Sequence, residues 1–316
     1  MKLGFIFSLP RSGSTYVQRV LSGAPSIKTT PEPWLLPALF GIRTGSAPLA
    51  DFAYDHVRIG ISDMLNLLPN GDEVWRSAIA EMTTFLYEHF CENPTDLFLD
   101  KTPRNAGFCE DILSAFPDAR ILFLWRNPLA VVHSINETWG GGQWNAYFYE
   151  YDLRKGLPAL IECWNAHQSE ERVLSICYED LVSSPQTHWP KIFEHFEAPY
   201  SSEFVTNPAK LLSTMGDQTG QQRYIGTSSN SVDSWQTGFG GPLRKHWARR
   251  YLEYLGTDAL QTMGYDKEVL SEELSAARGN GRLSDAVFIP FGPVYHFIEP
   301  YILRNKAWPP SQFARR

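Results

Sequence analysis

The sequence predicts an α/β fold, a three-layer sandwich in which a central parallel sheet carries helices on both faces. Short apolar segments alternate with segments of helical periodicity over most of the 316 residues, the pattern of a parallel sheet. Hydrophobic residues make up 43% and charged residues 20% of the chain, as in an average globular protein. A chain of this length can bury a sufficient core without disulfides or a structural metal.

The expected strands are short and apolar, and they are Leu3–Leu9, Leu97–Leu99, Arg120–Trp125 and Val173–Cys177. The first expected helix begins at Ser14 or Thr15 and ends at Leu21, because Gly23 is a natural stop. Pro128 suits a first helical turn, so we expect a helix from there to about Thr138. The remaining expected helices are Val74–Phe90, Ala106–Phe116, Tyr151–Glu171, Pro185–Phe196 and Leu243–Leu255.

Two regions fall outside this regular pattern. Ala209–Ser234 is polar and is expected to be loop, and the last forty residues are expected to be irregular. We expect residues 1–270 to form the main domain and residues 271–316 to form a C-terminal extension. That extension should pack on the domain or on a partner, because it carries too many apolar side chains for a solvated tail: Phe288, Phe291, Tyr295, Phe297, Ile298, Tyr301 and Ile302.

Charge and composition exclude several classes of function. With 28 basic and 35 acidic residues the net charge is −7, which argues against binding nucleic acid or anionic membranes. The apolar segment 286–303 contains prolines and Glu299, so it does not predict a transmembrane helix. The N-terminal apolar run ends at Pro10, so we expect a buried strand there and no signal peptide. The four cysteines show no CxxC pair and no Cys/His metal spacing, which favours reduced thiols, a cytoplasmic protein and no metal.

The first candidate ligand-binding motif lies between the first expected strand and the first expected helix. Its sequence is Ser8-Leu9-Pro10-Arg11-Ser12-Gly13-Ser14-Thr15. It is similar to the phosphate-binding P-loop, with Gly13 and Thr15 at matching positions, and it predicts a P-loop-like sandwich. Backbone N–H groups and a helix N-terminus can cradle a phosphate there. Ser14 replaces the usual lysine and Arg11 supplies the cation, which argues against hydrolysis of ATP or GTP. The alternative is a Ser/Gly turn that binds no ligand.

The second motif begins at Arg126, where the most apolar strand ends, and it runs to Ser134 on the following helix. An arginine at a strand tip and a helix hydroxyl can hold a second anionic group. Alone, the pair is better explained as a surface arginine and a solvent-facing serine. Ligands of open parallel sheets bind beyond the carboxyl ends of the strands. Two anion sites on neighbouring strands therefore suit a nucleotide with 5′ and 3′ phosphates.

With both motifs in view, the chain resembles the sulfotransferases that use 3′-phosphoadenosine 5′-phosphosulfate (PAPS), in the branch of the tyrosylprotein and many bacterial enzymes. The resemblance covers roughly residues 3–265. It implies that Arg11, Ser12, Gly13, Ser14 and Thr15 bind the 5′-phosphosulfate. It also implies that Arg126 and Ser134 bind the 3′-phosphate and that Tyr178, in the segment Tyr178-Glu179-Asp180-Leu181, lies near the adenine. Asp233-Ser234-Trp235 resembles the end of a late loop in the family.

The chain also departs from the cytosolic members of that family. We find no clear Arg-Lys-Gly loop for the 3′-phosphate, so Ser228 or Ser229 is expected to act in its place. No Walker-B acid is apparent, and no metal is implied.

Two further residues are candidates for the transfer step. Lys101 follows the strand Leu97–Leu99 in an Asp-Lys-Thr-Pro segment, which in the family contacts the transferring group. Glu32 lies between two prolines that favour an extended backbone, and in the family a glutamate after the first helix acts as base. The alternatives are a solvated Lys101 and a Glu32 that only pairs with a nearby cation such as Lys28. His133 is expected to be structural, and it is the next candidate for the base.

The resemblance thus predicts in-line transfer of a sulfuryl group from PAPS to an acceptor hydroxyl or amine. Other candidate functions are a P-loop kinase of nucleotides or small molecules and a non-catalytic module that binds adenosine bisphosphate. The expected acceptor is a small molecule such as a secondary metabolite, a sugar or a lipid, and a peptide is a further alternative. The aromatic stretch Trp139–Tyr151 could line its pocket or simply pack in the core. The sequence gives no oligomeric state.

Overall fold

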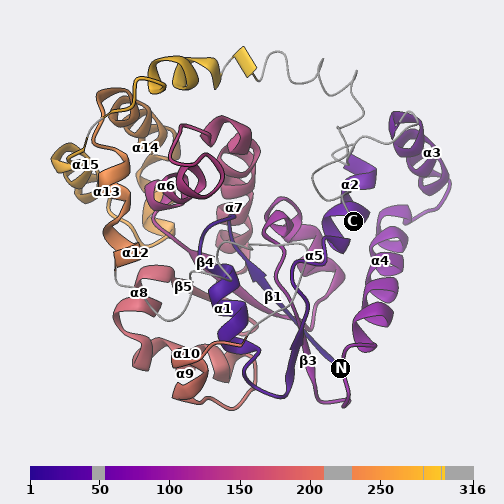
Figure 1. Cartoon of the computed structure of the whole chain (residues 1–316). Coiled ribbons are helices and arrows are strands. Elements are labelled where there is room, and N and C mark those ends of the chain that lie inside the picture. Colours follow the sequence, from indigo (N-terminus) through magenta and orange to yellow (C-terminus); the bar gives the residue numbers. More distant parts are fainter. Residues whose placement is uncertain (45–53, 210–229, 280, 293, 296–316) are drawn as a thin grey trace, which may run out of the picture.

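A five-stranded, wholly parallel sheet forms the centre of the molecule, in the strand order β2-β3-β1-β4-β5 (Figure 1). The computed structural model describes residues 1–44, 54–209, 230–279, 281–292 and 294–295. The strands are β1 (Lys2–Phe7), β2 (Ile27–Thr29), β3 (Leu97–Asp100), β4 (Arg120–Trp125) and β5 (Val173–Cys177). The predicted α/β class and parallel sheet are confirmed.

Helices connect successive strands. The N-terminal half contains α1 (Ser14–Leu21), α2 (Leu35–Thr44), α3 (Tyr54–Asn66), α4 (Gly71–Glu88), the 3₁₀ helix η1 (Pro103–Phe108), α5 (Cys109–Ala115) and α6 (Pro128–Trp139). The second half contains the 3₁₀ helix η2 (Ala146–Tyr149), the π-helical turn η3 (Asp152–Gly156), α7 (Leu157–His167), α8 (Tyr178–Ser183), α9 (Pro185–His195), α10 (Ser202–Thr206), α12 (Asn230–Asp233), α13 (Trp235–Gly238), α14 (Pro242–Thr262) and α15 (Lys267–Ala276).

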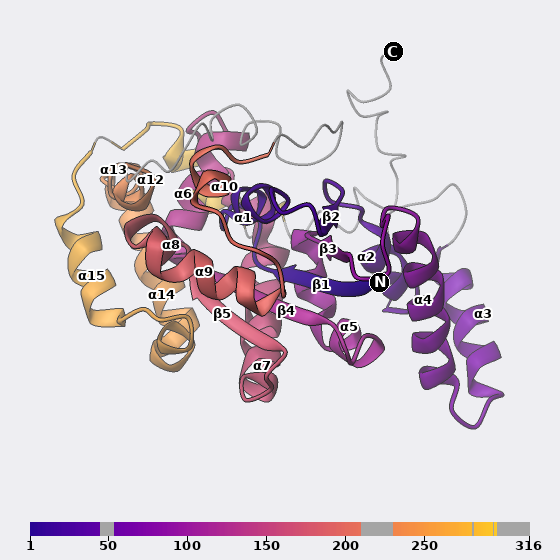
Figure 2. The same ribbon diagram turned by 90° about the horizontal axis from the view of Figure 1, so that it is seen from below.

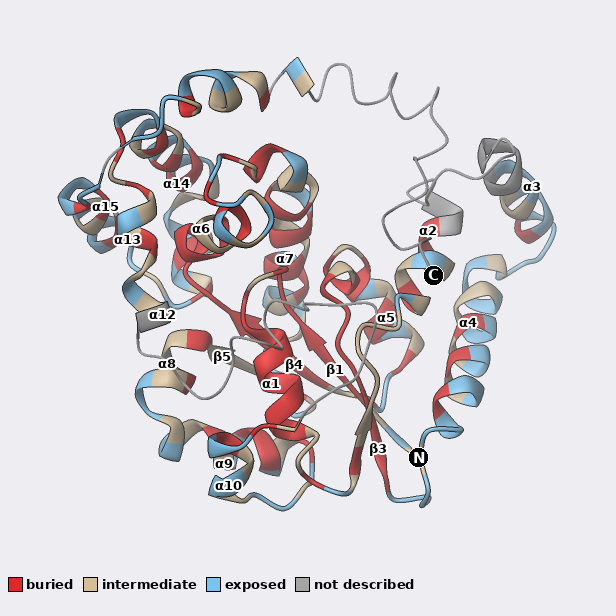
Figure 3. Ribbon diagram, viewed as in Figure 1, coloured by how far each residue is buried: buried red, intermediate tan, exposed pale blue. Residues whose placement is uncertain are grey.

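Alternate strand residues face two separate cores, which makes the sandwich three-layered. Phe5 and Phe123 pack with helices α5, α6, α7 and α14 on one face of the sheet. Ile6 and Leu122 pack with α1, α8 and α9 on the other. Figure 2 shows α1 and α7 on opposite sides of the strands, and Figure 3 shows that β1 and β4 are almost wholly buried. A period of two along each strand assigns successive side chains to opposite cores.

Several expected elements differ from those observed. β2, α2, α3, α8 and α15 were not predicted. The expected helix over 106–116 is divided into η1 and α5, and the one over 151–171 opens with a π turn and ends at His167. The expectation that the last forty residues are irregular is wrong for 285–292, which are helical. Most of the loop expected over 209–234 lies outside the described residues, whereas 230–233 are helical.

The described part of the C-terminal extension lies against the main body. Asp285 forms a buried ion pair with Arg244 of α14, with an oxygen–nitrogen distance of 2.8 Å. Phe288, Ile289, Phe291 and Tyr295 pack against the core on the α7 and α14 face. The division at residue 270 stays a prediction, and it falls inside α15. No helix in the described ranges is long and apolar enough to cross a membrane.

Candidate active site

Five parallel strands bring the predicted site residues to one edge of the sheet, since all of their carboxyl ends point the same way. The Ser8–Thr15 loop follows β1, Lys101 follows β3, and Arg126 follows β4. Tyr178 follows β5, and Glu32 lies three residues after β2. The motifs that are far apart in the sequence therefore belong to a single site.

The loop after β1 has the backbone of an anion cradle. Arg11 and Gly13 have positive φ angles, 68° and 88°, so the loop reverses locally before α1 begins at Ser14. A side chain at position 13 is impossible without rearrangement, because a Cβ there would lie 2.4 Å from the ring of Tyr178. Ser12, Ser14 and Thr15 are buried at the N-terminus of α1. The positive end of the α1 dipole and its free N–H groups favour a phosphate at this position.

The second anion site adjoins the first. The Nε atom of Arg11 donates a hydrogen bond to Oγ of Ser134 at 3.1 Å. Arg126 donates from its guanidinium to the carbonyl oxygen of Arg11 at 2.7 Å, and it lies over the ring of Tyr178 at 4.6 Å from the centroid. Arg11, Arg126, Ser134 and Tyr178 thus lie together at this edge of the sheet. Ser228 and Ser229 lie outside the described residues.

The buried Lys101 and the partly buried Glu32 form an ion pair beside the candidate anion cradle. The Nζ atom of Lys101 lies 2.7 Å from Oε1 of Glu32 and 3.3 Å from Oγ1 of Thr15. The side chains of Lys101 and Glu32 are 2% and 12% exposed. Lys28 pairs with Glu92, so the cation beside Glu32 is Lys101 rather than Lys28, and the alternative of a Glu32 that only pairs with a cation stays to be tested by activity. The ammonium group therefore joins the N-terminus of α1 to the carboxylate.

Asp100 fixes the turn that carries Lys101. Its carboxylate accepts hydrogen bonds from the Tyr87 hydroxyl at 2.7 Å and from the Thr102 hydroxyl at 2.9 Å. Burial raises the pKa of Asp100, and the hydrogen bonds from Tyr87, Thr102 and Asn105 oppose that rise. The sequence motif contains Asp100, but Tyr87 lies on α4 and nothing in its local pattern indicated this role.

Gln18 fixes the segment that leads to Glu32. It is buried on α1, and its side-chain amide donates to Oγ1 of Thr29 at 2.7 Å and to the carbonyl oxygen of Thr30 at 2.8 Å. Glu179 similarly links the site to the segment between α14 and α15, because it accepts from the backbone N–H of Asn127 at 3.1 Å and from the Tyr265 hydroxyl at 2.6 Å. Sequence reasoning missed Gln18, whose helical position gives no sign of its long-range partners.

His133 occupies a different environment from the ion pair. It packs so closely on Gly238 of α13 that an added Cβ would lie 2.1 Å from Nδ1. Burial lowers the pKa of His133, the nearby Glu137 raises it, and Arg126 and Arg244 lower it further. This packing supports the structural interpretation of His133.

Comparison with known proteins agrees with this geometry. A model described as "Sulfotransferase family" matches residues 5–202. The nodulation protein NoeE of Sinorhizobium fredii is 23% identical over 84% of this chain and 66% of its own length. A protein-tyrosine sulfotransferase of Drosophila melanogaster is 23% identical over 74% of this chain and 47% of its own length. The chain thus spans about two thirds of the first relative and about half of the second.

Solved structures show the same fold. The sulfotransferase domain of the olefin synthase of Synechococcus PCC 7002 superposes with a TM-score of 0.55, at 23% identity, over 75% of this chain and 88% of that one. The sulfotransferase domain from the curacin biosynthetic pathway gives a TM-score of 0.51, at 20% identity, over 75% of this chain and 90% of that one. These matches confirm the predicted P-loop-like sandwich.

Proposed function

This chain belongs to the sulfotransferase family, and from that premise we propose that it transfers a sulfuryl group from PAPS to an acceptor hydroxyl or amine, releasing adenosine 3′,5′-bisphosphate. PAPS is the donor typical of the family. Arg11, Ser12, Gly13, Ser14 and Thr15 bind the 5′-phosphosulfate against the N-terminus of α1.

Arg126 and Ser134 bind the 3′-phosphate, and Tyr178 lies beside the adenine. Two neighbouring cations on these loops support that assignment, because Arg126 contacts the backbone of Arg11 and Arg11 contacts Ser134. Ser228 and Ser229 stay proposed ligands of the 3′-phosphate on the strength of the sequence resemblance.

The transfer step needs a base for the acceptor and cations for the leaving group. The acceptor oxygen or nitrogen forms a bond to sulfur as the bond between sulfur and the bridging oxygen breaks, and the electron pair of that bond stays on the 5′-phosphate. Glu32 takes the proton of the acceptor. Lys101 and Arg11 stabilise the charge that develops on the bridging oxygen and the sulfonate. A well-placed base contributes roughly 10²–10⁴ in rate.

The observation that carries the proposal is the position of the Lys101 ammonium, 2.7 Å from Glu32 and 3.3 Å from Thr15. One cation therefore adjoins both the phosphate-binding helix and a carboxylate that can accept a proton. A binding module needs the cation but has no use for the carboxylate. A P-loop kinase needs a lysine where this chain has Ser14.

We propose a small-molecule acceptor, such as a secondary metabolite, a sugar or a lipid. Trp139 stacks on Tyr149 with ring centroids 4.6 Å apart, and the guanidinium of Arg11 lies 5.5 Å from the centroid of Trp139. These rings form an aromatic wall beside the donor site, which suits an acceptor with an apolar or aromatic part. We also propose a cytoplasmic location, which the four unpaired cysteines support.

Sulfur-labelled PAPS provides the test of the proposed reaction. Incubation with a panel of phenols, sugars and hydroxylated lipids should transfer label to one acceptor class and release adenosine 3′,5′-bisphosphate. Failure of every acceptor to take label while the bisphosphate still binds would favour the non-catalytic module.

Thermal denaturation tests the donor separately. Adenosine 3′,5′-bisphosphate at 100 times its dissociation constant should stabilise the fold by about 2.7 kcal/mol, and ATP with Mg²⁺ should do so much less. Arg126→Ala should lower the affinity for the bisphosphate. The affinity for adenosine 5′-phosphosulfate, which lacks the 3′-phosphate, should stay almost unchanged. Equal stabilisation by ATP with Mg²⁺ would contradict the two-phosphate site.

A further inference from the structure

Three side chains of types that can ligate a metal lie together between α5 and α7, outside the proposed active site. Glu110 lies on α5, and Cys163 and His167 lie on α7. One potential ligand atom of each residue lies within 4.8 Å of those of the other two. Cys163 and His167 are four residues apart, so they share one face of the helix. This cluster departs from the sequence expectation of no Cys/His metal spacing and no metal, because Cys163 and His167 meet Glu110 only in the folded chain.

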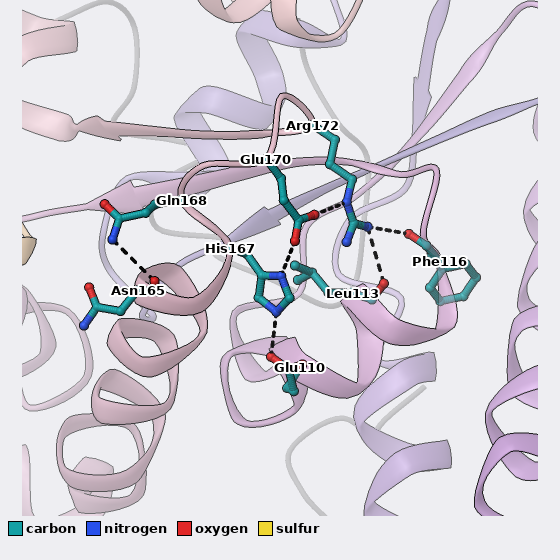
Figure 4. Close-up of polar contacts among 8 residues, drawn as sticks. All are labelled: Glu110, Leu113, Phe116, Asn165, His167, Gln168, Glu170 and Arg172. Carbon is teal, nitrogen blue, oxygen red and sulfur yellow. Dashed lines mark hydrogen bonds and ion pairs between the residues drawn. The ribbon is translucent and has the colours of Figure 1, made fainter.

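The imidazole of His167 is held in a fixed orientation (Figure 4). Its Nδ1 contacts Oε1 of Glu170, and that carboxylate also accepts from Nε of Arg172 at 2.6 Å. Arg172 in turn donates to the carbonyl oxygens of Leu113 and Phe116 at the end of α5. A histidine whose Nδ1–H is donated to a carboxylate presents the lone pair of Nε2 to a metal. The Nε2 of His167 lies 3.0 Å from Oε2 of Glu110.

We propose that Glu110, Cys163 and His167 bind a zinc ion. A carboxylate, a thiolate and an imidazole make up a donor set that suits zinc, and their two negative charges balance the ion. In tetrahedral coordination at the usual bond lengths, the nitrogen and oxygen ligands lie about 3.3 Å apart, so the observed 3.0 Å requires little movement. A water molecule completes the four ligands.

The burial of the cluster fits an ion that enters from solvent. Cys163 is 3% exposed, whereas the side chain of Glu110 is 64% exposed. The ion would therefore lie between the protein core and water, with its fourth position on the open side.

Zinc at this point would join α5 to α7. Glu170 and Arg172 immediately precede β5, at the amino ends of the strands, whereas Lys101 and Arg126 follow the carboxyl ends. The ion would therefore stabilise the contact between α5 and α7 at a distance from the proposed sulfuryl transfer, which should proceed unchanged without it. The same side chains can instead form a metal-free group in which His167 pairs with Glu110 and Glu170, and this arrangement is the outcome that the experiment must separate.

Cobalt is the probe, because a cysteine thiolate bound to Co²⁺ gives a charge-transfer absorption band. The full chain, stripped of metal with a chelator, should bind one equivalent of Co²⁺ with that band and with the visible bands of tetrahedral cobalt. Zn²⁺ should displace the cobalt and raise the melting temperature. Absence of saturable binding, or binding without the thiolate band, would overturn the proposal in favour of the metal-free ion pair.

Variants assign the ligands. Cys163→Ser should abolish the thiolate band, and His167→Gln should lower the affinity for Co²⁺ at least tenfold. Glu110→Gln changes an exposed side chain, so this variant should fold normally and should also bind Co²⁺ more weakly. Cys91→Ser is the matched control, since Cys91 pairs with none of these residues, and it should keep both the band and the affinity. Unchanged binding in Cys163→Ser and Glu110→Gln would contradict the site.

Discussion

The Lys101–Glu32 pair sets the clearest expectation at the scale of single residues. Glu32→Gln should lower kcat by at least about 100-fold and leave the affinity for adenosine 3′,5′-bisphosphate nearly intact, because the amide cannot take the acceptor proton. Steady-state kinetics and a melting curve on the same sample measure both effects. The control is Glu92→Gln, which breaks the more exposed pair with Lys28 and should leave kcat unchanged. A near-normal kcat in Glu32→Gln would move the base elsewhere, and His133 is then the next residue to test.

A substitution at Gly13 tests whether the loop after β1 binds the nucleotide. Gly13→Ala should reduce the affinity for adenosine 3′,5′-bisphosphate at least tenfold, because φ is 88° and the added Cβ meets the Tyr178 ring at 2.4 Å. Calorimetric titration measures the loss. Gly60→Ala is the matched control: it adds the same methyl group into open space on α3 and should stabilise that helix by about 0.5–1 kcal/mol. Unaltered affinity in Gly13→Ala would mean that the nucleotide does not bind close to the backbone of this loop.

The residue scale also shows what local patterns can predict. A motif at the end of a strand predicts the position of its residues, because all parallel strands end at one edge; Arg11, Lys101 and Arg126 reached that edge for this reason. The motif does not predict which side chains pair there. The contact of Lys101 with Glu32 and the support of Asp100 by Tyr87 depend on the packing of α4 and on the strand order.

At the scale of elements, the apolar strands of five or six residues were predicted well, whereas the short β2 and several helices were not. β4 and β5 have the predicted bounds, since their apolar runs are bordered by polar residues. β2 has only three residues, too few to show a period, and it exists because β3 supplies its hydrogen bonds. The helix expected at 106–116 is preceded by a 3₁₀ helix that begins at Pro103, whose ring fixes the backbone of the first turn.

The contact of the C-terminal segment with α14 gives a prediction at this scale. Asp285→Ala should leave the Arg244 guanidinium buried without its carboxylate, at a cost of about 3–5 kcal/mol, and release the helical residues 285–292 from the body. Hydrogen–deuterium exchange should show faster amide exchange over that segment, while adenosine 3′,5′-bisphosphate still binds. Leu283→Ala, at a side chain that is 97% exposed, is the control and should leave exchange unchanged. Equal exchange in both variants would mean that aromatic packing alone holds the segment.

The dependence of stability on pH is a property of the whole molecule, because it sums over every group whose pKa differs between the folded and the unfolded chain. His195 is an informative group: burial lowers its pKa from 6.5 to about 4, Arg120 adds to this, and a hydrogen bond to the Ile121 carbonyl opposes it. The folded protein thus binds fewer protons at this side chain than the unfolded chain does. Its contribution to stability is complete above pH 6.5 and is lost as the pH falls toward the folded value near 4.

The measurement compares wild type with His195→Gln, whose amide can keep the bond to Ile121 without titrating. The difference in the free energy of unfolding between the two proteins isolates His195 from the carboxylates that titrate in the same range. This difference should shift by about 2 kcal/mol against the wild type between pH 7.5 and pH 5, as urea denaturation at each pH would show. A difference that stays constant with pH would mean that His195 has the same pKa in the folded and the unfolded chain, so that burial against β4 does not disfavour its charged form.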